Sequence, residues 1–191
     1  MNKSELRKSY LERRRAIPAN EHARLSGEII ARLFSIIHFG MLRSMHCYIS
    51  MDHFGEVETA NLFKRVWEVH PVLETSAPRV DSSSGEIESI EYGPDTSVVT
   101  SAWGIQEPAG PGRVAPETLD LVIVPLLCSD ARGHRVGYGK GYYDRFLQQC
   151  RPDCIKAGLS FFPPVEEIDD IHAADVALDL VVSPHETYYF K

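Results

Sequence analysis

Residues 119–125 have the sequence LDLVIVP, and residues 130–147, shortly after them, have the sequence DARGHRVGYGKGYYDRFL. The first stretch is an apolar run that ends at a proline, which predicts a strand buried on both faces of a parallel or mixed sheet. The second places a glycine-rich loop between that strand and a helix predicted at 142–149. In α/β proteins, ligands gather where strands end and helices begin. These two stretches therefore indicate the fold class and the place of the site together.

Helices and strands are predicted to alternate on both sides of this region. The hydrophobic spacing predicts further helices at 4–16, 20–37 and 59–69. Other strands are predicted at 45–49, 72–76, 87–92, 155–160 and, as the last of the chain, 177–182. Such alternation predicts a single α/β domain over 1–191, with a central mixed, largely parallel sheet flanked by helices. The Gly- and Pro-rich segment 93–116 is expected to be a binding loop or lid, because compact domains seldom keep such long connections without a use.

The glycine-rich loop has the residues that a phosphate site needs. Its four glycines are Gly133, Gly137, Gly139 and Gly141. Without β-carbons, their backbone N–H groups can close on phosphate oxygens, and the N-terminus of the following helix favours negative charge. Lys140 is followed by Gly141 instead of Ser or Thr, and the glycine spacing differs from GxGxxG, so neither standard phosphate motif matches. The loop predicts a different phosphate cradle with Arg135 and Lys140 as cations; the alternative is a turn with solvated charges.

Asp144 lies three residues after Gly141, which places its carboxylate on the first turn of the predicted helix. A magnesium ion would link this carboxylate to phosphates in the loop, because Mg²⁺ prefers oxygen ligands and uses only one or two protein carboxylates. Alternatively, the carboxylate only stabilises the N-terminus of the helix. Position alone favours neither interpretation.

The predicted N-terminal helix carries basic residues on one face. Lys3, Arg7 and Arg14 fall within about 40° of one another on a helical wheel. Such a stripe can bind phosphates, although a solvated helix face is the ordinary explanation for it. A targeting sequence is disfavoured because Glu5 and Glu12 interrupt the basic residues.

Two carboxylates, Glu56 and Glu58, stand between the first predicted strand and its helix, at the end of the sheet where ligands gather. Glu58 can be a charge that stabilises the start of the helix. Glu56 lies just outside the helix, where a carboxylate suits a pterin-like ring that offers paired N–H donors. The residues alone leave both interpretations open.

The composition of the chain limits the classes of function. It has 191 residues, of which 43% are hydrophobic and 25% charged, and a net charge of −7. These values are typical of a globular protein, and the negative charge disfavours nucleic acid as a partner. No apolar run approaches the ~20 residues of a membrane span, and no secretory signal is found. We therefore expect a cytoplasmic protein that has no membrane partner. We also expect a monomer, although composition does not bear on the oligomeric state.

The cysteines give no sign of a disulfide framework or of a zinc site. Cys47, Cys128, Cys150 and Cys154 lack the paired CxxC spacing of zinc sites, and they are too few for a disulfide scaffold. We expect reduced structural thiols. A metal site of Cys150, Cys154 and His172 is the alternative.

Four motifs occur in order along nearly the whole chain. They are KxxLR at 3–7, EVET at 56–59, WGIQEP at 103–108 and GHRVGYGKGYYDRFL at 133–147. Together they resemble the 5-formyltetrahydrofolate cyclo-ligase family, and the long loop motif is the most specific of the four.

The resemblance implies an enzyme that uses ATP as co-substrate and Mg²⁺ as cofactor to convert 5-formyltetrahydrofolate to 5,10-methenyltetrahydrofolate. In this reaction ATP phosphorylates the formyl oxygen, N10 attacks the activated carbon, and phosphate leaves. The protein would mainly position the reacting groups and neutralise charge.

The resemblance also implies roles for individual residues. ATP would contact Lys3, Arg7, Arg135, Gly137, Tyr138, Gly139, Lys140, Gly141, Tyr142 and Tyr143. The catalytic residues, which neutralise charge on the transferring phosphoryl group, would be Lys140 and Arg135. The metal ligands would be Asp144 and Asp175, with Asp179 as the competitor of Asp175. The folate would contact Ile49, Glu56, Tyr142 and Trp103, whose indole would stack on the flat ring.

Some positions depart from the family's pattern. Leu126 stands where a glycine is common, Ser129 where an aromatic residue is common, and 161–164 where a glutamine is usual; the turn at 52–55 is also longer. These positions are expected to border the substrate pocket, so the alternative function is a diverged, non-catalytic folate- or nucleotide-binding protein. A further alternative, an RNA-associated protein that uses the basic run 13–15, conflicts with the net charge.

Overall fold

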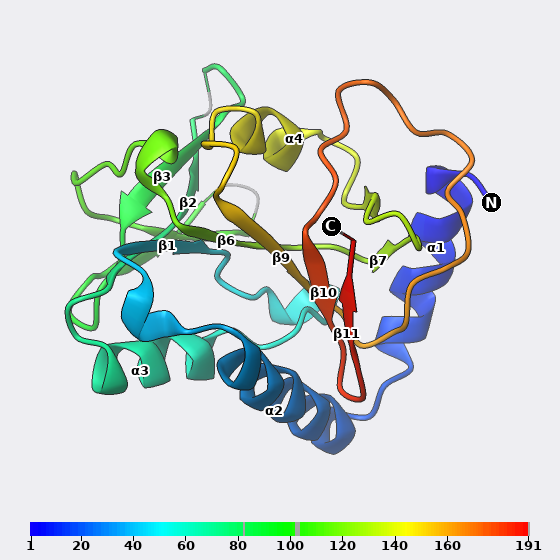
Figure 1. Cartoon of the computed structure of the whole chain (residues 1–191), viewed down its shortest axis with the longest axis horizontal. Coiled ribbons are helices and arrows are strands. Elements are labelled where there is room, and N and C mark those ends of the chain that lie inside the picture. Colours follow the sequence, from blue (N-terminus) through cyan, green and yellow to red (C-terminus); the bar gives the residue numbers. More distant parts are fainter. Residues whose placement is uncertain (82, 102–103, 191) are drawn as a thin grey trace.

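The computed structural model describes residues 1–81, 83–101 and 104–190, and its centre is a seven-stranded sheet (Figure 1). In chain order the strands are β1 (Ser44–Cys47), β2 (Glu74–Val80), β3 (Ile87–Glu91), β6 (Leu121–Val124), β9 (Ile155–Leu159), β10 (Leu180–Val182) and β11 (Thr187–Tyr189). Across the sheet their order is β11-β10-β9-β6-β1-β2-β3. The five inner strands are parallel, and β3 and β11 are antiparallel at the two edges. The expected mixed, largely parallel sheet is confirmed.

Helices cover both faces of this sheet. They are α1 (Lys3–Arg15), α2 (Ala19–Ile36), α3 (Ala60–Val69) and α4 (Tyr142–Leu147). Figure 1 shows α2 and α3 along one side of the sheet and α4 on the other. The alternation of side chains on β6 produces this layering, because Leu121 and Ile123 enter the core beneath α2 and α3, whereas Val122 and Val124 pack in the core that contains Phe146 of α4. All four residues of β6 are buried, as the apolar run predicts.

α1 packs beside the sheet, against a small hairpin whose turn contains Gly133 and which precedes the other three glycines of the loop. This hairpin consists of β7 (Cys128–Ser129) and β8 (Arg135–Val136). Leu6 and Tyr10 of α1 share a buried cluster with Cys128 and Val136. A capping box begins the helix, with the Asn2 side chain accepting the Glu5 N–H and the Glu5 carboxylate accepting the Asn2 N–H. The basic face of α1 is thereby fixed next to the glycine-rich loop.

The described part of the segment 93–116 is more ordered than a long loop. It contains the antiparallel pair β4 (Val98–Thr100) and β5 (Gln106–Pro108) and leads to the 3₁₀ turn η3 (Pro116–Thr118). Two other 3₁₀ turns, η1 (Phe39–Met41) and η2 (Asp52–Phe54), stand before and after β1. Within the described ranges, no helix has the combination of length and apolar character needed to cross a membrane.

Each predicted helix is present, with ends that differ by one or two residues. Two strand predictions were wrong in position. The strand expected at 72–76 is β2, which continues through Pro78 because β3 pairs with it antiparallel, Pro78 opposite Ser89. The strand expected at 177–182 is shorter, as β10, and it is not the last, since β11 follows and pairs with it.

Candidate functional site

A cavity of about 690 Å³ lies where β1, β2 and β6 end, with α1 and the glycine loop, residues 133–141, contributing to its lining. The carboxyl ends of parallel strands are the usual place for ligands in open α/β sheets. Every site residue predicted from the sequence lines this cavity apart from Trp103, which lies outside the described residues. The fold therefore gathers residues from both ends of the chain around one space.

The basic stripe of α1 faces the protein. Lys3 and Arg7 line the cavity, and Arg14 is only 3% exposed. The interpretation as a solvated helix face is therefore wrong. In the run 13–15, on which the RNA-associated alternative rests, the middle residue is buried and the other two are exposed.

Arg7 connects α1 to the glycine loop. Its Nε–H donates to the carbonyl oxygen of Gly137 over 2.8 Å. Gly139 has a φ of +91°, which glycine adopts without strain, and a β-carbon there would lie 3.2 Å from the Arg7 guanidinium. Lys140, the next residue, is exposed. The loop thus presents an exposed cation beside one that is held by a hydrogen bond.

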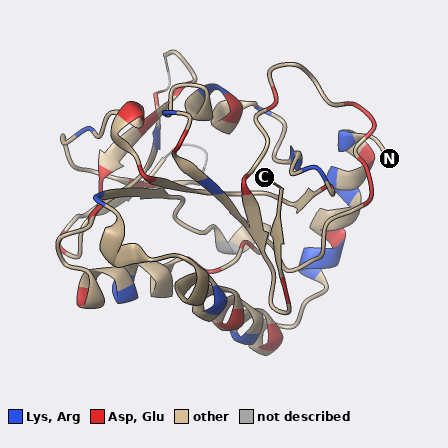
Figure 2. Cartoon of the chain, in the orientation of Figure 1, with Lys and Arg blue, Asp and Glu red and all other residues tan. Residues whose placement is uncertain are grey.

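Each of the two predicted metal carboxylates is paired with a predicted ATP-binding cation. Arg135 donates from Nη2 to Asp144 Oδ1 over 2.7 Å, and Lys3 Nζ donates to Asp175 Oδ2. Figure 2 shows basic residues of α1 beside acidic stretches of the loop that precedes β10. Asp175 lines the cavity, whereas Asp179 accepts the backbone N–H of Lys156 at the start of β9. The geometry thus favours Asp175 over Asp179 at this site.

Opposite charges balance one another in these pairs. Burial lowers the pKa of Arg135, and the neighbouring carboxylates Asp144 and Asp175 oppose that shift. Burial alone would raise the pKa of Asp175, but the backbone N–H of His172 and the Lys3 ammonium together lower it. The site is therefore a cluster of alternating charges, which suits a ligand that contains both phosphate groups and a cation.

Glu56 enters the cavity from the connection between β1 and α3. It is 3% exposed, and both of its oxygens are engaged. The Tyr138 hydroxyl donates to Oε1 over 2.7 Å, and the Met51 N–H donates to Oε2 over 2.8 Å. Burial raises the pKa of Glu56, and these hydrogen bonds partly oppose the rise. Glu58 instead lies 3.3 Å from His22 of α2, so Glu56 is the carboxylate that faces the cavity.

Some cavity residues are not singled out by the sequence patterns. Glu107 is 6% exposed and accepts the backbone N–H of Val80 over 3.1 Å. Its place in the WGIQEP motif is a signal that could have identified it. Phe54 lines the cavity from η2, and Met51 contributes a backbone N–H to Glu56. A pattern of side chains cannot predict a backbone N–H donor, because every residue except proline has one.

Most positions that depart from the family's pattern do not border the cavity. Leu126 is buried in the core, where its Cδ2 occupies the space above Gly158. Ser129 is buried, and the Phe161 ring packs against His22 with centroids 4.8 Å apart. The described lining includes none of the departures at 126, 129 and 161–164, so this expectation was wrong. The longer turn at 52–55 does border the cavity, through Phe54.

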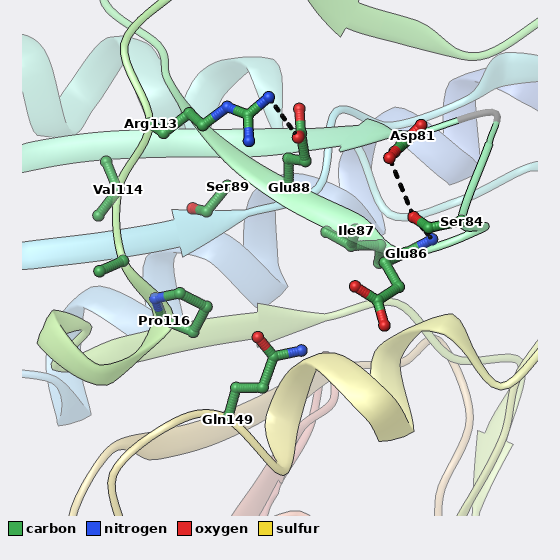
Figure 3. A pocket seen from close by; sticks show the side chains of 11 residues that line it. Asp81, Ser84, Glu86, Ile87, Glu88, Ser89, Arg113, Val114, Pro116 and Gln149 are labelled. Atoms are coloured by element: carbon green, nitrogen blue, oxygen red, sulfur yellow. Dashed lines mark hydrogen bonds and ion pairs between the residues drawn. The ribbon is translucent and has the colours of Figure 1, made fainter.

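A second cavity of about 340 Å³ lies between β3 and the segment that leads to η3 (Figure 3). Apart from Glu86, its charged groups already have partners within the protein. Glu88 pairs with Arg79 and Arg113, and Asp81 accepts hydrogen bonds from Ser83 and Ser84. The first cavity is therefore the candidate site.

The thiols do not assemble a metal site in the described structure. All four cysteines are free, and three of them are buried. The described residues contain no group of three or more His, Cys, Asp or Glu side chains that could hold an ion. His172 lines the main cavity, while Cys154 is buried in the core beneath α4. The proposed Cys150, Cys154 and His172 site therefore gains no support.

Comparison with known proteins agrees with this arrangement. The chain is 30% identical over 185 residues to the 5-formyltetrahydrofolate cyclo-ligase of Escherichia coli K12, covering 93% of this chain and 97% of that protein. It is 28% identical over 153 residues to the mouse protein of the same name, covering 76% and 73% of the two chains.

Solved structures give the same match. The NMR structure of Aquifex aeolicus 5,10-methenyltetrahydrofolate synthetase has a TM-score of 0.85 at 31% identity, covering 100% of this chain and 94% of that one. The synthetase from Mycoplasma pneumoniae has a TM-score of 0.77 at 25% identity, covering 96% and 99%. The model of the 5-formyltetrahydrofolate cyclo-ligase family matches residues 1–184. The chain belongs to the 5-formyltetrahydrofolate cyclo-ligase family.

Proposed function

We propose that this chain is the enzyme that closes 5-formyltetrahydrofolate to 5,10-methenyltetrahydrofolate, with ATP as co-substrate and Mg²⁺ as cofactor. The γ-phosphoryl group moves from ATP to the formyl oxygen, and ADP leaves. N10 then bonds to the formyl carbon and loses its proton, and the carbon–oxygen bond breaks to release phosphate. ATP thereby converts a poor leaving oxygen into phosphate.

The observation that carries this proposal is the gathering of complementary groups around one cavity. Lys3, Arg7, Arg135 and Lys140 bring four cations to it, and the glycine loop brings backbone exposed by the absence of β-carbons. Glu56 brings a buried carboxylate that is suited to accept N–H donors. This set fits a polyphosphate and a heterocycle bound side by side.

In the phosphate part of the site, the proposed roles of Lys140 and Arg135 follow from the exposure of the first and the hydrogen bonds of the second. Lys140 is exposed on the loop, so its ammonium can follow the phosphoryl group during transfer. Before ATP binds, Arg135 is held by Asp144 and by the carbonyl oxygen of Val176, so its charge is already positioned at the cavity. Fixed and mobile donors directed at the developing charge lower the barrier to phosphoryl transfer.

The carboxylates Asp144 and Asp175 fit the ligand set of a magnesium ion. Each uses one oxygen for its cation, and the other, Asp144 Oδ2 or Asp175 Oδ1, has no hydrogen-bond partner among the described residues. Mg²⁺ uses one or two protein carboxylates together with phosphate oxygens, and it supplies charge neutralisation there. We infer that Lys3 and Arg135 exchange these carboxylates for phosphate oxygens when ATP binds with the metal.

In the folate part of the site, Glu56 would accept N–H groups of the pterin ring, and Ile49 and Tyr142 would contact its faces. Trp103 keeps its expected role as a stacking wall. Every group in this proposal comes from one chain, so we also propose that a monomer is active.

The test is the absorbance of the methenyl product when the purified protein is mixed with 5-formyltetrahydrofolate, ATP and Mg²⁺. We expect product in the complete mixture, loss of turnover with EDTA, and recovery on addition of excess Mg²⁺. Saturating substrates without any product would refute the proposal. Ligand-dependent thermal stabilisation without turnover would instead identify the non-catalytic binding protein, an alternative weakened by the position of most departures outside the cavity.

A further inference from the structure

Arg14 is a buried cation close to the site, although it does not line the cavity. It lies in the last turn of α1 and is 3% exposed. Its Nη1–H donates to the Tyr138 hydroxyl over 3.2 Å, and its Nη2–H donates to the carbonyl oxygen of Leu126. Its Nε–H has no acceptor among the described residues. Burial of an incompletely bonded charge is costly, so a purely structural role is a poor explanation for this residue.

The two hydrogen bonds of the Tyr138 hydroxyl, one to Arg14 and one to Glu56, have defined donors and acceptors. A guanidinium only donates hydrogen bonds, so the Tyr138 oxygen accepts from Arg14. The single hydroxyl proton of Tyr138 is then directed to Glu56 Oε1, 2.7 Å away. The Phe54 ring packs on Tyr138 with centroids 4.6 Å apart, which restrains the ring from another side. Arg14, Tyr138 and Glu56 therefore form a one-way chain of hydrogen bonds.

We infer that Arg14 is a positioning residue for the folate, which acts through Tyr138 to hold Glu56 as an oriented hydrogen-bond acceptor. The inference rests on the proposed role of Glu56 in folate binding. It also places the action of the Tyr138 hydroxyl at the folate, whereas the family resemblance assigns Tyr138 to ATP.

The charges around Glu56 support this role. Burial raises the pKa of Glu56, and Tyr138, the Met51 N–H, Arg14 and His53 each lower it. The other titratable groups that interact with Glu56 electrostatically are Cys47, Tyr48 and Tyr143, and burial raises the pKa of each of them. These three stay neutral, so Arg14 and His53 are the basic residues that favour the ionised carboxylate. Without Arg14, the protonated form of Glu56 persists to higher pH and accepts fewer hydrogen bonds.

The experiment compares Arg14→Met, Arg14→Lys and Tyr138→Phe with the wild-type enzyme, and uses Arg15→Met as the matched control. Arg15 is the adjacent arginine and is exposed. For each variant, KM is measured separately for 5-formyltetrahydrofolate and ATP, and kcat/KM for the folate is measured across the acid limb of the pH profile.

Arg14→Met and Tyr138→Phe are each expected to raise KM for the folate about tenfold, as for a lost hydrogen bond to a charged group. In both variants the acid limb should move to higher pH, while KM for ATP changes less than about twofold. Arg14→Lys should give a smaller rise in the folate KM and a smaller displacement of the acid limb than Arg14→Met, because lysine retains the positive charge. Arg15→Met should behave as wild type.

An unchanged acid limb and folate KM in both variants would overturn the inference, as would a rise in KM for ATP alone. If Arg14→Met does not fold, Tyr138→Phe decides the question, because it keeps the ring against Phe54 and removes only the hydroxyl. Failure of the wild-type enzyme to form the methenyl product would count against the proposed function itself, so the two failures are distinguishable.

Discussion

Glu56 combines an ionisable side chain with almost complete burial, and the two properties oppose each other. Burial raises its folded-state pKa above that of the unfolded chain, which lies near ~4.3. As the pH rises from the unfolded-state pKa of Glu56 towards its higher folded-state pKa, the unfolded chain loses the proton first. Ionisation of Glu56 therefore makes folding less favourable. The carboxylate is therefore retained against a cost in stability, as expected for a binding residue.

Glu56→Gln removes the ionisable group and, with it, this pH-dependent contribution to the free energy of folding. We expect the free energy of unfolding of the variant, relative to wild type, to increase as the pH rises above about 4 and to level off once the pH exceeds the raised folded-state pKa of Glu56. Denaturant unfolding at several pH values measures it. Glu58→Gln, a nearby carboxylate outside the cavity, is the control. A pH-independent difference for Glu56→Gln would contradict the assigned cause.

Lys140 and Asp144 should differ in how they affect stability. Lys140 is exposed, so Lys140→Met should lower kcat about 100-fold and leave the thermal unfolding midpoint unchanged. Asp144→Asn should lower kcat and also destabilise the fold by about 3 kcal/mol, because it weakens the ion pair of buried Arg135. Steady-state kinetics and calorimetry measure the two effects. Equal stability of the variants would show that the pair of Arg135 and Asp144 contributes little to the fold.

At the scale of elements, the glycine loop is shaped to fit α1. Gly139→Ala would strain a φ of +91° and place a β-carbon 3.2 Å from the Arg7 guanidinium. We expect a loss of about 1–3 kcal/mol in stability together with a higher KM for ATP. Gly137→Ala is the matched control, because a β-carbon there meets nothing within 4 Å. Equal stability losses in the two variants would refute this account of the loop.

A second closely fitted glycine, Gly158, lies in β9. A β-carbon at Gly158 would lie 2.8 Å from both Leu126 Cδ2 and Leu178 Cδ1. Gly158→Ala should therefore cost about 1–3 kcal/mol. Adding Leu126→Ala should recover part of that loss, so a double-mutant cycle should show coupling between the two positions. Strict additivity would mean that Leu126 does not fill the space above Gly158.

At the scale of the molecule, the sequence predicts most elements because their signals are local. The apolar run of β6 and the spacing of the helices need only neighbouring residues. The position of β2 is different, since Pro78 disfavours a strand locally and only pairing with β1 and β3 places it there. The same reason explains β11, a short edge strand defined by its pairing with β10. The division into one domain remains a prediction.

The site was predictable as a set of residues and unpredictable as a set of contacts. The motifs point to Lys3 and Glu56, and the family resemblance adds Asp175, but the ion pair between Lys3 and Asp175 joins positions 172 residues apart. No spacing rule reaches that far. Arg14 was visible on the basic stripe, yet its link to Glu56 depends on Tyr138, which only the folded chain brings between them.

The most direct test of the central claim follows the formyl oxygen. With 5-formyltetrahydrofolate labelled with ¹⁸O in the formyl group, phosphorylation of that oxygen predicts one labelled oxygen in each phosphate released. Mass spectrometry of the phosphate measures the label, with Lys140→Met as a slow control that should give the same labelling at a lower rate. Methenyl product accompanied by unlabelled phosphate would contradict the claim that this site transfers a phosphoryl group from ATP to the folate.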